Sequence, residues 1–177
     1  MSTPTNEEKV LKILLDKNYI SKEDLKAAID SDEYSSPVDY LLDKEILTKD
    51  LLGQAIAESL EATYADLNSN MPTKEGALKI PEKIARAYRI VLFKEDDKTI
   101  TLTSDNPKVS GVKNELKSLI GKRKATISYS LSEDIDTVLQ YYDKPLAERL
   151  LKLVEVGEKV APNQQRMWVR RSVLYYP

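Results

Sequence analysis

Two copies of one short module stand at the start of this chain, and they constrain its fold more than any other feature. The sequence Leu-Leu-Asp-Lys at residues 14–17 recurs at residues 41–44, which is 27 positions further on (41 − 14). The same shift aligns further pairs of like residues: Ile20 with Leu47, Ser21 with Thr48, Lys22 with Lys49, Leu25 with Leu52, Ala28 with Ala55 and Ile29 with Ile56. A repeat of this length is typical of a helical hairpin that cannot bury its apolar face alone and therefore packs on its copy.

Each copy predicts two amphipathic helices joined by a tight turn. Asn18 suits the left-handed conformation that ends a first helix, and Ser21 suits the cap of a second. Ser36, which a proline follows, and Thr48 take the capping places in the second copy. The apolar residues recur at helical spacing: Val10, Leu11, Leu14, Leu15, Leu25, Ala28, Ile29, Val38, Leu41, Leu42, Leu52, Ala55 and Ile56. Helices this short are not stable alone, so we expect residues 5–60 to form a four-helix lobe.

The remainder of the chain alternates between helical and strand-like patterns, which predicts a small sheet with helices packed on it. An extended segment at 62–67 and a polar loop at 68–76 come first. The expected elements then follow in the order helix 81–88, strand 89–93, strand 99–103, helix 105–120, strand 124–129 and helix 130–141. One more amphipathic helix is expected at 146–154, and the last residues, 161–177, have no clear period.

These patterns predict an α+β fold in three parts. With 177 residues, the chain is long enough for one medium domain or for two small lobes that share an interface. Residues 1–61 are the repeated helical module, a four-helix lobe of two helical hairpins. Residues 62–144 are a small α-β-β-α-β-α domain, and residues 145–177 are a C-terminal linker helix and tail.

Composition excludes most catalytic chemistry. The chain has no cysteine and no histidine, which rules out a thiolate nucleophile, a cysteine-ligated zinc ion and a Ser-His-Asp triad. Its five glycines do not have the spacing of a Walker A loop, because Leu116 stands where the first glycine before Gly121 would be. We therefore expect no enzyme, with no catalytic residue, no metal site and no cofactor.

Charge and hydropathy exclude two further kinds of partner. The net charge is −2 with both signs mixed along the chain, so its field attracts neither nucleic acid nor an anionic membrane. No apolar run reaches the roughly eighteen residues that a membrane span needs. The N-terminus lacks the pattern of a secretory signal. We expect a cytoplasmic protein that neither binds nucleic acid nor inserts directly into a membrane.

The order of these segments resembles the N-terminal region of the assembly ATPases of bacterial type II secretion and type IV pilus machines. The resemblance covers residues 9 to about 145 and includes the paired helices. Its other landmarks, in chain order, are Tyr64-Ala65-Asp66-Leu67, the segment 80–88, Asp105-Asn106-Pro107 and the helix that starts at Ser132-Glu133-Asp134-Ile135 and ends in tyrosine. The ATPase core that follows in that family, with its Walker boxes, has no counterpart here.

The resemblance implies a non-catalytic docking or regulatory domain. In the family this region attaches a hexameric motor to an inner-membrane platform protein or an actin-like scaffold protein. It would therefore lie in the cytoplasm and reach the inner membrane through such partners. The missing core drives hexamer formation in full-length members, which leaves a monomer open for this chain. A stand-alone relic of a truncated gene is a further reading.

The alternative function is that of a cyclic di-GMP sensor, because some members of the family bind this ligand through the paired helices. The residues that would do so in the first module are Lys9, Leu14, Leu15, Asn18 and Ile20. The family pattern has arginine, leucine and glycine where this chain has Lys9, Val10 and Leu11. Each charged hydrogen bond that is lost costs roughly 1.5–3 kcal/mol. Docking is therefore the favoured reading.

Overall fold

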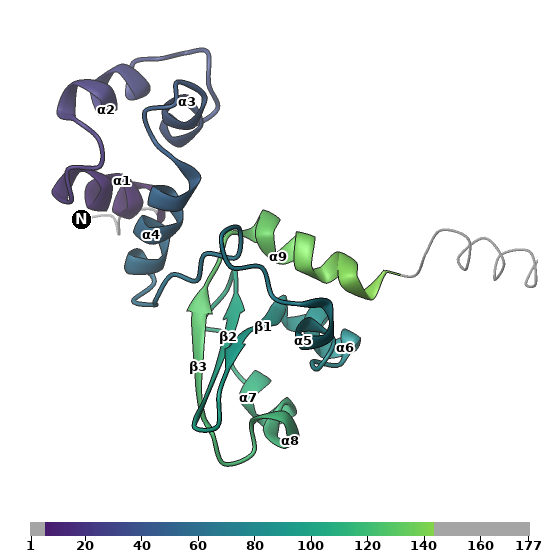
Figure 1. Cartoon of the computed structure of the whole chain (residues 1–177). Helices are drawn as coiled ribbons and strands as arrows, with labels where there is room; N and C mark the ends of the chain where they lie inside the picture. Colours follow the sequence, from purple (N-terminus) through teal and green to yellow (C-terminus); the bar gives the residue numbers. More distant parts are fainter. Residues whose placement is uncertain (1–5, 144–177) are drawn as a thin grey trace, which may run out of the picture. The chain divides into compact units, whose positions relative to one another are not determined.

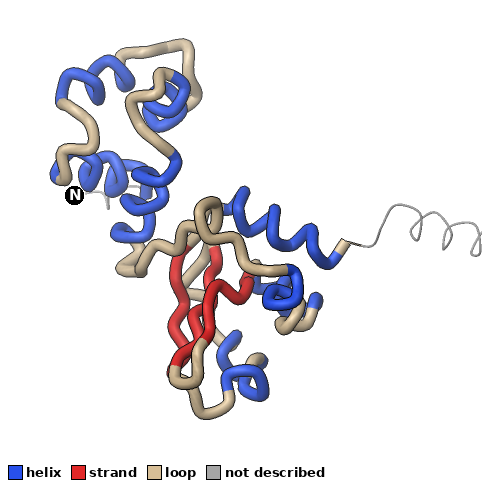
Figure 2. The backbone as a smooth tube through the Cα atoms, viewed as in Figure 1, coloured by secondary structure: helices blue, strands red, loops and turns tan. Residues whose placement is uncertain are grey.

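Four short helices make up the first part of the computed structural model, which describes residues 6–143 (Figures 1 and 2). They are α1 (Asn6–Asp16), α2 (Lys22–Ile29), α3 (Pro37–Asp43) and α4 (Lys49–Ser59). Helix α1 packs against α4, and α2 packs against α3. Each helix therefore contacts a helix of the other module, and the predicted four-helix lobe is confirmed.

Helices end and begin with the same backbone features in both modules. Asn18 (φ 57°) and Glu45 (φ 55°) occupy equivalent positions, and both adopt the left-handed conformation. The following amides then donate to equivalent carbonyls, Tyr19 N to Leu14 O at 2.9 Å and Ile46 N to Leu41 O at 3.0 Å. The side chains that cap the next helices accept from the amide three residues on, as predicted: Ser21, Ser36 and Thr48.

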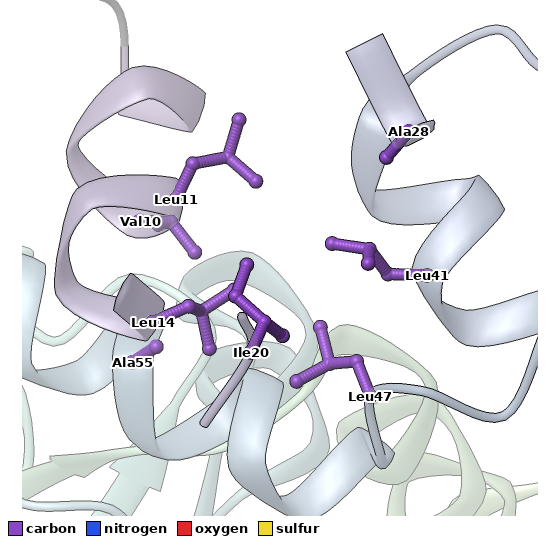
Figure 3. Close-up of a cluster of buried hydrophobic side chains, with 8 residues drawn as sticks. All are labelled: Val10, Leu11, Leu14, Ile20, Ala28, Leu41, Leu47 and Ala55. Atoms are coloured by element: carbon purple, nitrogen blue, oxygen red, sulfur yellow. The ribbon is translucent and has the colours of Figure 1, made fainter. Parts of the chain in front are cut away.

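The repeated leucines face one shared interior. Leu14 and Leu41 hold equivalent places in the two modules, and neither exposes any surface (0%). Figure 3 shows the cluster that they belong to, in which the labelled side chains point toward one another: Val10, Leu11, Leu14, Ile20, Ala28, Leu41, Leu47 and Ala55. Full burial of one such aliphatic side chain contributes roughly 1.5–3 kcal/mol. The repeat therefore supplies the core of this lobe.

A three-stranded sheet with helices on it forms the second part. Its elements are α5 (Lys74–Ala77), α6 (Glu82–Tyr88), β1 (Ile90–Glu95), β2 (Thr99–Ser104), α7 (Val112–Glu115), α8 (Lys117–Ile120), β3 (Lys124–Tyr129), α9 (Ser132–Leu139) and the 3-10 turn η1 (Gln140–Tyr142). The strand order is β1-β2-β3, with β1 antiparallel and β3 parallel to the central strand. Helices α5, α6 and α9 pack against β1. The α+β fold class is thus the predicted one.

Arg89 explains two boundaries that the sequence pattern placed wrongly. It is a left-handed cap (φ 45°) that ends α6, so β1 begins one residue later than expected. Its guanidinium binds the carboxylates of Asp105 at 2.5 Å and of Asp136 at 2.6 Å. Asp105 therefore pairs with Arg89 and lies several residues before the next helix. The helical stretch starts at Val112, after left-handed Gly111 (φ 86°), and breaks into α7 and α8.

Two further details differ from the predicted pattern. The polar loop at 68–76 contains the first residues of α5, whose cap is the Thr73 hydroxyl. The extended segment at 62–67 is no full strand, because its one bridge to the sheet joins Tyr64 to Tyr129. Such short elements leave too little periodicity for a pattern to detect.

The limits of the described chain leave some predictions open. Residues 6–141 belong to one compact unit. The helix expected at 146–154 and the tail lie outside the described residues, and the three-part division at residues 61 and 144 stays a prediction. Within residues 6–143, none of the helices has the length and apolar character that crossing a membrane requires.

Replacing Ser21 by alanine should destabilise the protein by about 1 kcal/mol, the usual cost of losing such a helix cap. The Ser21 hydroxyl accepts a hydrogen bond from the amide of Asp24 at 3.0 Å, and this amide has no partner within the helix. Urea unfolding followed by circular dichroism measures the change. Ser118→Ala, an exposed serine of α8, is the matched control. Equal losses in the two variants would refute the role of the cap.

Candidate functional site

Of the residues expected to bind a dinucleotide, some lie in the core and others lie at the surface. Leu14 (0%) and Ile20 (5%) belong to the core cluster, and Leu15 packs against it while partly exposed. Lys9 and Asn18 are exposed. The structure thus brings the three apolar members together in the interior and leaves the two polar ones at the surface. Their assignment to a ligand stays a prediction.

A groove lies where the starts of the two modules meet α4. It is open to solvent and has a volume of about 320 Å³. Its lining residues come from three places, the start of α1, the start of α3 and the middle of α4: Asn6, Glu7, Val10, Ser36, Val38, Leu52 and Ile56. Among the residues that the structure describes, no lysine or arginine lines the groove, and its charged lining residue is Glu7. Such a groove suits apolar side chains and offers no counter-charge to a phosphate.

A tyrosine joins α4 to the sheet. The ring of Tyr64 lies directly on Gly53 of α4, where a β carbon would be 2.8 Å from the tyrosine hydroxyl oxygen and closer still to the ring. Neighbouring backbone groups tie this segment to β3, with Ala65 N donating to Tyr129 O and Tyr129 N donating to Thr63 O, both at 2.8 Å. The apolar side chains around the joint are Ile56, Ala57, Leu60, Ala62, Tyr64, Tyr129 and Leu131.

Burial changes the acidity of both tyrosines at this joint. It raises the pKa of the Tyr129 phenol to about 12. It also raises the pKa of Tyr64, and the carboxylate of Asp50 adds to this effect. The Tyr64 hydroxyl is buried without a hydrogen-bond partner among the described residues. Both phenols therefore stay neutral at physiological pH, and the Tyr64 side chain contributes to the joint through packing.

A polar cleft of about 290 Å³ lies between α4 and α9. Lys49 of α4 and Glu133 of α9 form an ion pair across it at 2.7 Å. Burial, followed by the nearby charges of Glu133 and Asp66, raises the pKa of Asp134, which also lines the cleft. Within residues 6–143, no group of three or more potential acidic ligands converges in a way that could hold a metal ion.

Asp134→Asn should raise the melting temperature at neutral pH. Because the pKa of Asp134 is raised in the folded state, folding is favoured while this carboxyl is protonated. That contribution is complete below the ordinary pKa and is lost as pH rises through the raised pKa. Thermal melts should therefore show a gain at pH 7 that vanishes near about pH 3. Asp97→Asn, in the exposed hairpin turn, is the control, and an equal gain there would contradict this cause.

Sequence reasoning missed the joint and the groove. Gly53 stands where the first module has Lys26, within a helix that glycine disfavours by about 1 kcal/mol relative to alanine. That departure from the repeat was the available signal for a close approach. Glu7 gave no comparable signal, since acidic residues are common in the first turn of a helix. Val38, Leu52 and Ile56 were expected in the core, and each is partly exposed.

Comparison with known families identifies the chain. The model of the MshEN domain matches residues 60–148, half of the chain, from the C-cap of α4 through all three strands. The chain belongs to the MshEN domain family, an N-terminal region of type II secretion and type IV pilus ATPases. No curated protein matches it.

Solved structures similar to this chain include one of MshE and two of the N-terminal domain of XpsE. The structure of MshE with cdg is 17% identical, with a TM-score of 0.46, and the match covers 75% of this chain and 98% of that one. The N-terminal domain of XpsE is 15% identical, with a TM-score of 0.43, and the match covers 81% of this chain and 100% of that one. A second crystal form of XpsE gives 14% identity and a TM-score of 0.41.

Proposed function

We propose that this chain is a non-catalytic docking and regulatory domain of a type II secretion or type IV pilus assembly ATPase. It binds a cytoplasmic partner, either an inner-membrane platform protein or an actin-like scaffold protein. Membership of the MshEN domain family supports this proposal. The sequence has no histidine, no cysteine and no Walker A loop, so the usual catalytic groups are missing. This composition supports a binding function for the chain.

The apolar groove on the helical lobe is the observation that carries the proposal. Surfaces that bind proteins need exposed aliphatic area, and the groove provides it through Val38, Leu52 and Ile56. The core beneath it is built from both modules, so the groove lies on closely packed side chains.

The alternative, a cyclic di-GMP sensor, is less well supported by the charges at this surface. Two phosphates need cations or a set of hydrogen-bond donors. The groove lining offers Glu7 as its charged group, and a carboxylate repels phosphate. Lys9 is exposed on α1 and can supply one point charge, but not the bidentate contact of an arginine. A sensor with these residues would bind weakly.

Co-purification tests the docking proposal. The full chain is expressed together with the cytoplasmic part of the platform or scaffold protein encoded beside it. We expect the two proteins to elute together in size-exclusion chromatography at micromolar concentration. An unrelated acidic helical protein of similar size serves as the control. Separate elution of the chain from every such candidate would refute the proposal.

A further inference from the structure

We propose that the groove at the starts of α1 and α3 receives one amphipathic helix of the docked protein. This helix inserts aliphatic side chains between the two modules and places a lysine or arginine against Glu7. The inference rests on the proposed docking function and adds to it the surface used and the chemistry of the segment bound.

The shape of the groove fits a short row of aliphatic side chains. Val10 is buried at its base (5%), and the partly exposed side chains of Val38, Leu52 and Ile56 line it. A volume of about 320 Å³ is sufficient for a few methyl-bearing side chains. Helical partners commonly insert residues three and four positions apart into grooves of this kind.

The charge of the rim specifies a basic partner. Both helices that open onto the groove carry acids in their first turns, Glu7 and Glu8 on α1 and Asp39 on α3, and the exposed Lys9 that follows Glu8 lies outside the lining. Hydrogen bonds from the Ser35 and Ser36 side chains lower the pKa of Asp39, which is therefore ionised at neutral pH. Within residues 6–143, the groove lining contributes no lysine or arginine. A helix flanked by cations is attracted to this rim, and an acidic helix is repelled.

The position of the groove explains why both modules are needed. Its walls combine the start of the first helix of each module with the second helix of the second module. A single hairpin would provide only part of this lining. Binding at the groove therefore requires the two modules to be packed together. Loss of that packing would abolish the binding.

Nuclear magnetic resonance of the full chain, labelled with ¹⁵N, tests the inference. The probe is a synthetic amphipathic helix with leucine along one face and lysine on its flanks. Its twin replaces every lysine by glutamate. We expect saturable shifts of the amides of Asn6, Val10, Val38 and Leu52 with the basic peptide, and none with its acidic twin. Shifts centred elsewhere, or equal binding of both peptides, would overturn the inference.

Charge reversal at the rim provides a second test that leaves the core intact. Glu7→Lys changes an exposed residue and should weaken binding of the basic peptide about threefold or more. Glu23→Lys is the matched control, because it reverses an exposed acid at the second position of α2, outside the groove lining. Equal affinities for the two variants would overturn the role of Glu7.

Different results would contradict the docking function and the assignment of the groove as the docking surface. If the platform protein binds the wild-type chain and the Glu7→Lys variant with the same affinity, the docking function is supported. The groove is then not the docking surface. If the basic peptide binds the groove but no platform or scaffold protein co-elutes, the proposed function fails while the groove keeps its chemistry.

Discussion

Leu41→Ala should lower the free energy of unfolding of the helical lobe by about 2–5 kcal/mol. Leu41 exposes no surface, and it lies in the cluster built from both modules. Truncation removes buried methyl groups and leaves a cavity that the surrounding helices can close only in part. Urea unfolding followed by the helical circular dichroism signal measures the loss.

Leu78→Ala is the matched control for this substitution. Leu78 is 43% exposed at the end of α5, so the same chemical change should cost only about 0.5 kcal/mol. A loss at Leu41 as small as that at Leu78 would contradict the packing of the repeated leucines against each other.

Gly53→Leu is expected to cost about 1–3 kcal/mol through overpacking. Leucine is a far better helix former than glycine, so helix propensity alone would stabilise this variant. The side chain has no room, however, because the Tyr64 ring occupies the space where a β carbon would lie. Gln54→Leu, the exposed next residue of α4, is the control and should be tolerated.

A double-mutant cycle separates this clash from a general defect of α4. In a Tyr64→Ala background the ring is gone, and Gly53→Leu should lose most of its cost. We expect a coupling energy of about 1 kcal/mol or more between the two positions, as for residues in direct contact. Additive losses would show that the ring and the glycine do not meet.

The helices of the helical lobe could be predicted from the sequence because each helix start and end depends on residues only a few positions apart. Ser21 and Thr48 cap helices through an amide three positions on, and Asn18 ends a helix through its own backbone conformation. Because the pattern occurs in both modules, each module supported the prediction made for the other. The patterns of β2 and β3 were equally local, and both strands lie where predicted.

The features that sequence reasoning missed depend on contacts between distant residues. Asp105 has the appearance of a helix cap, but it is held by Arg89, sixteen positions away. The Gly53–Tyr64 joint depends on how α4 meets the sheet, and the groove depends on which faces of α1, α3 and α4 come together. The family resemblance gave the order of elements, but it could not give these contacts.

Calorimetric titration of the 177-residue chain tests the central claim most directly. One titrant is the cytoplasmic part of the platform or scaffold protein, and the other is cyclic di-GMP. A docking lobe with an apolar, acid-rimmed groove predicts saturable heat with the protein and no heat with the dinucleotide at high micromolar concentration. Saturable heat with the dinucleotide, together with none from the protein, would contradict it.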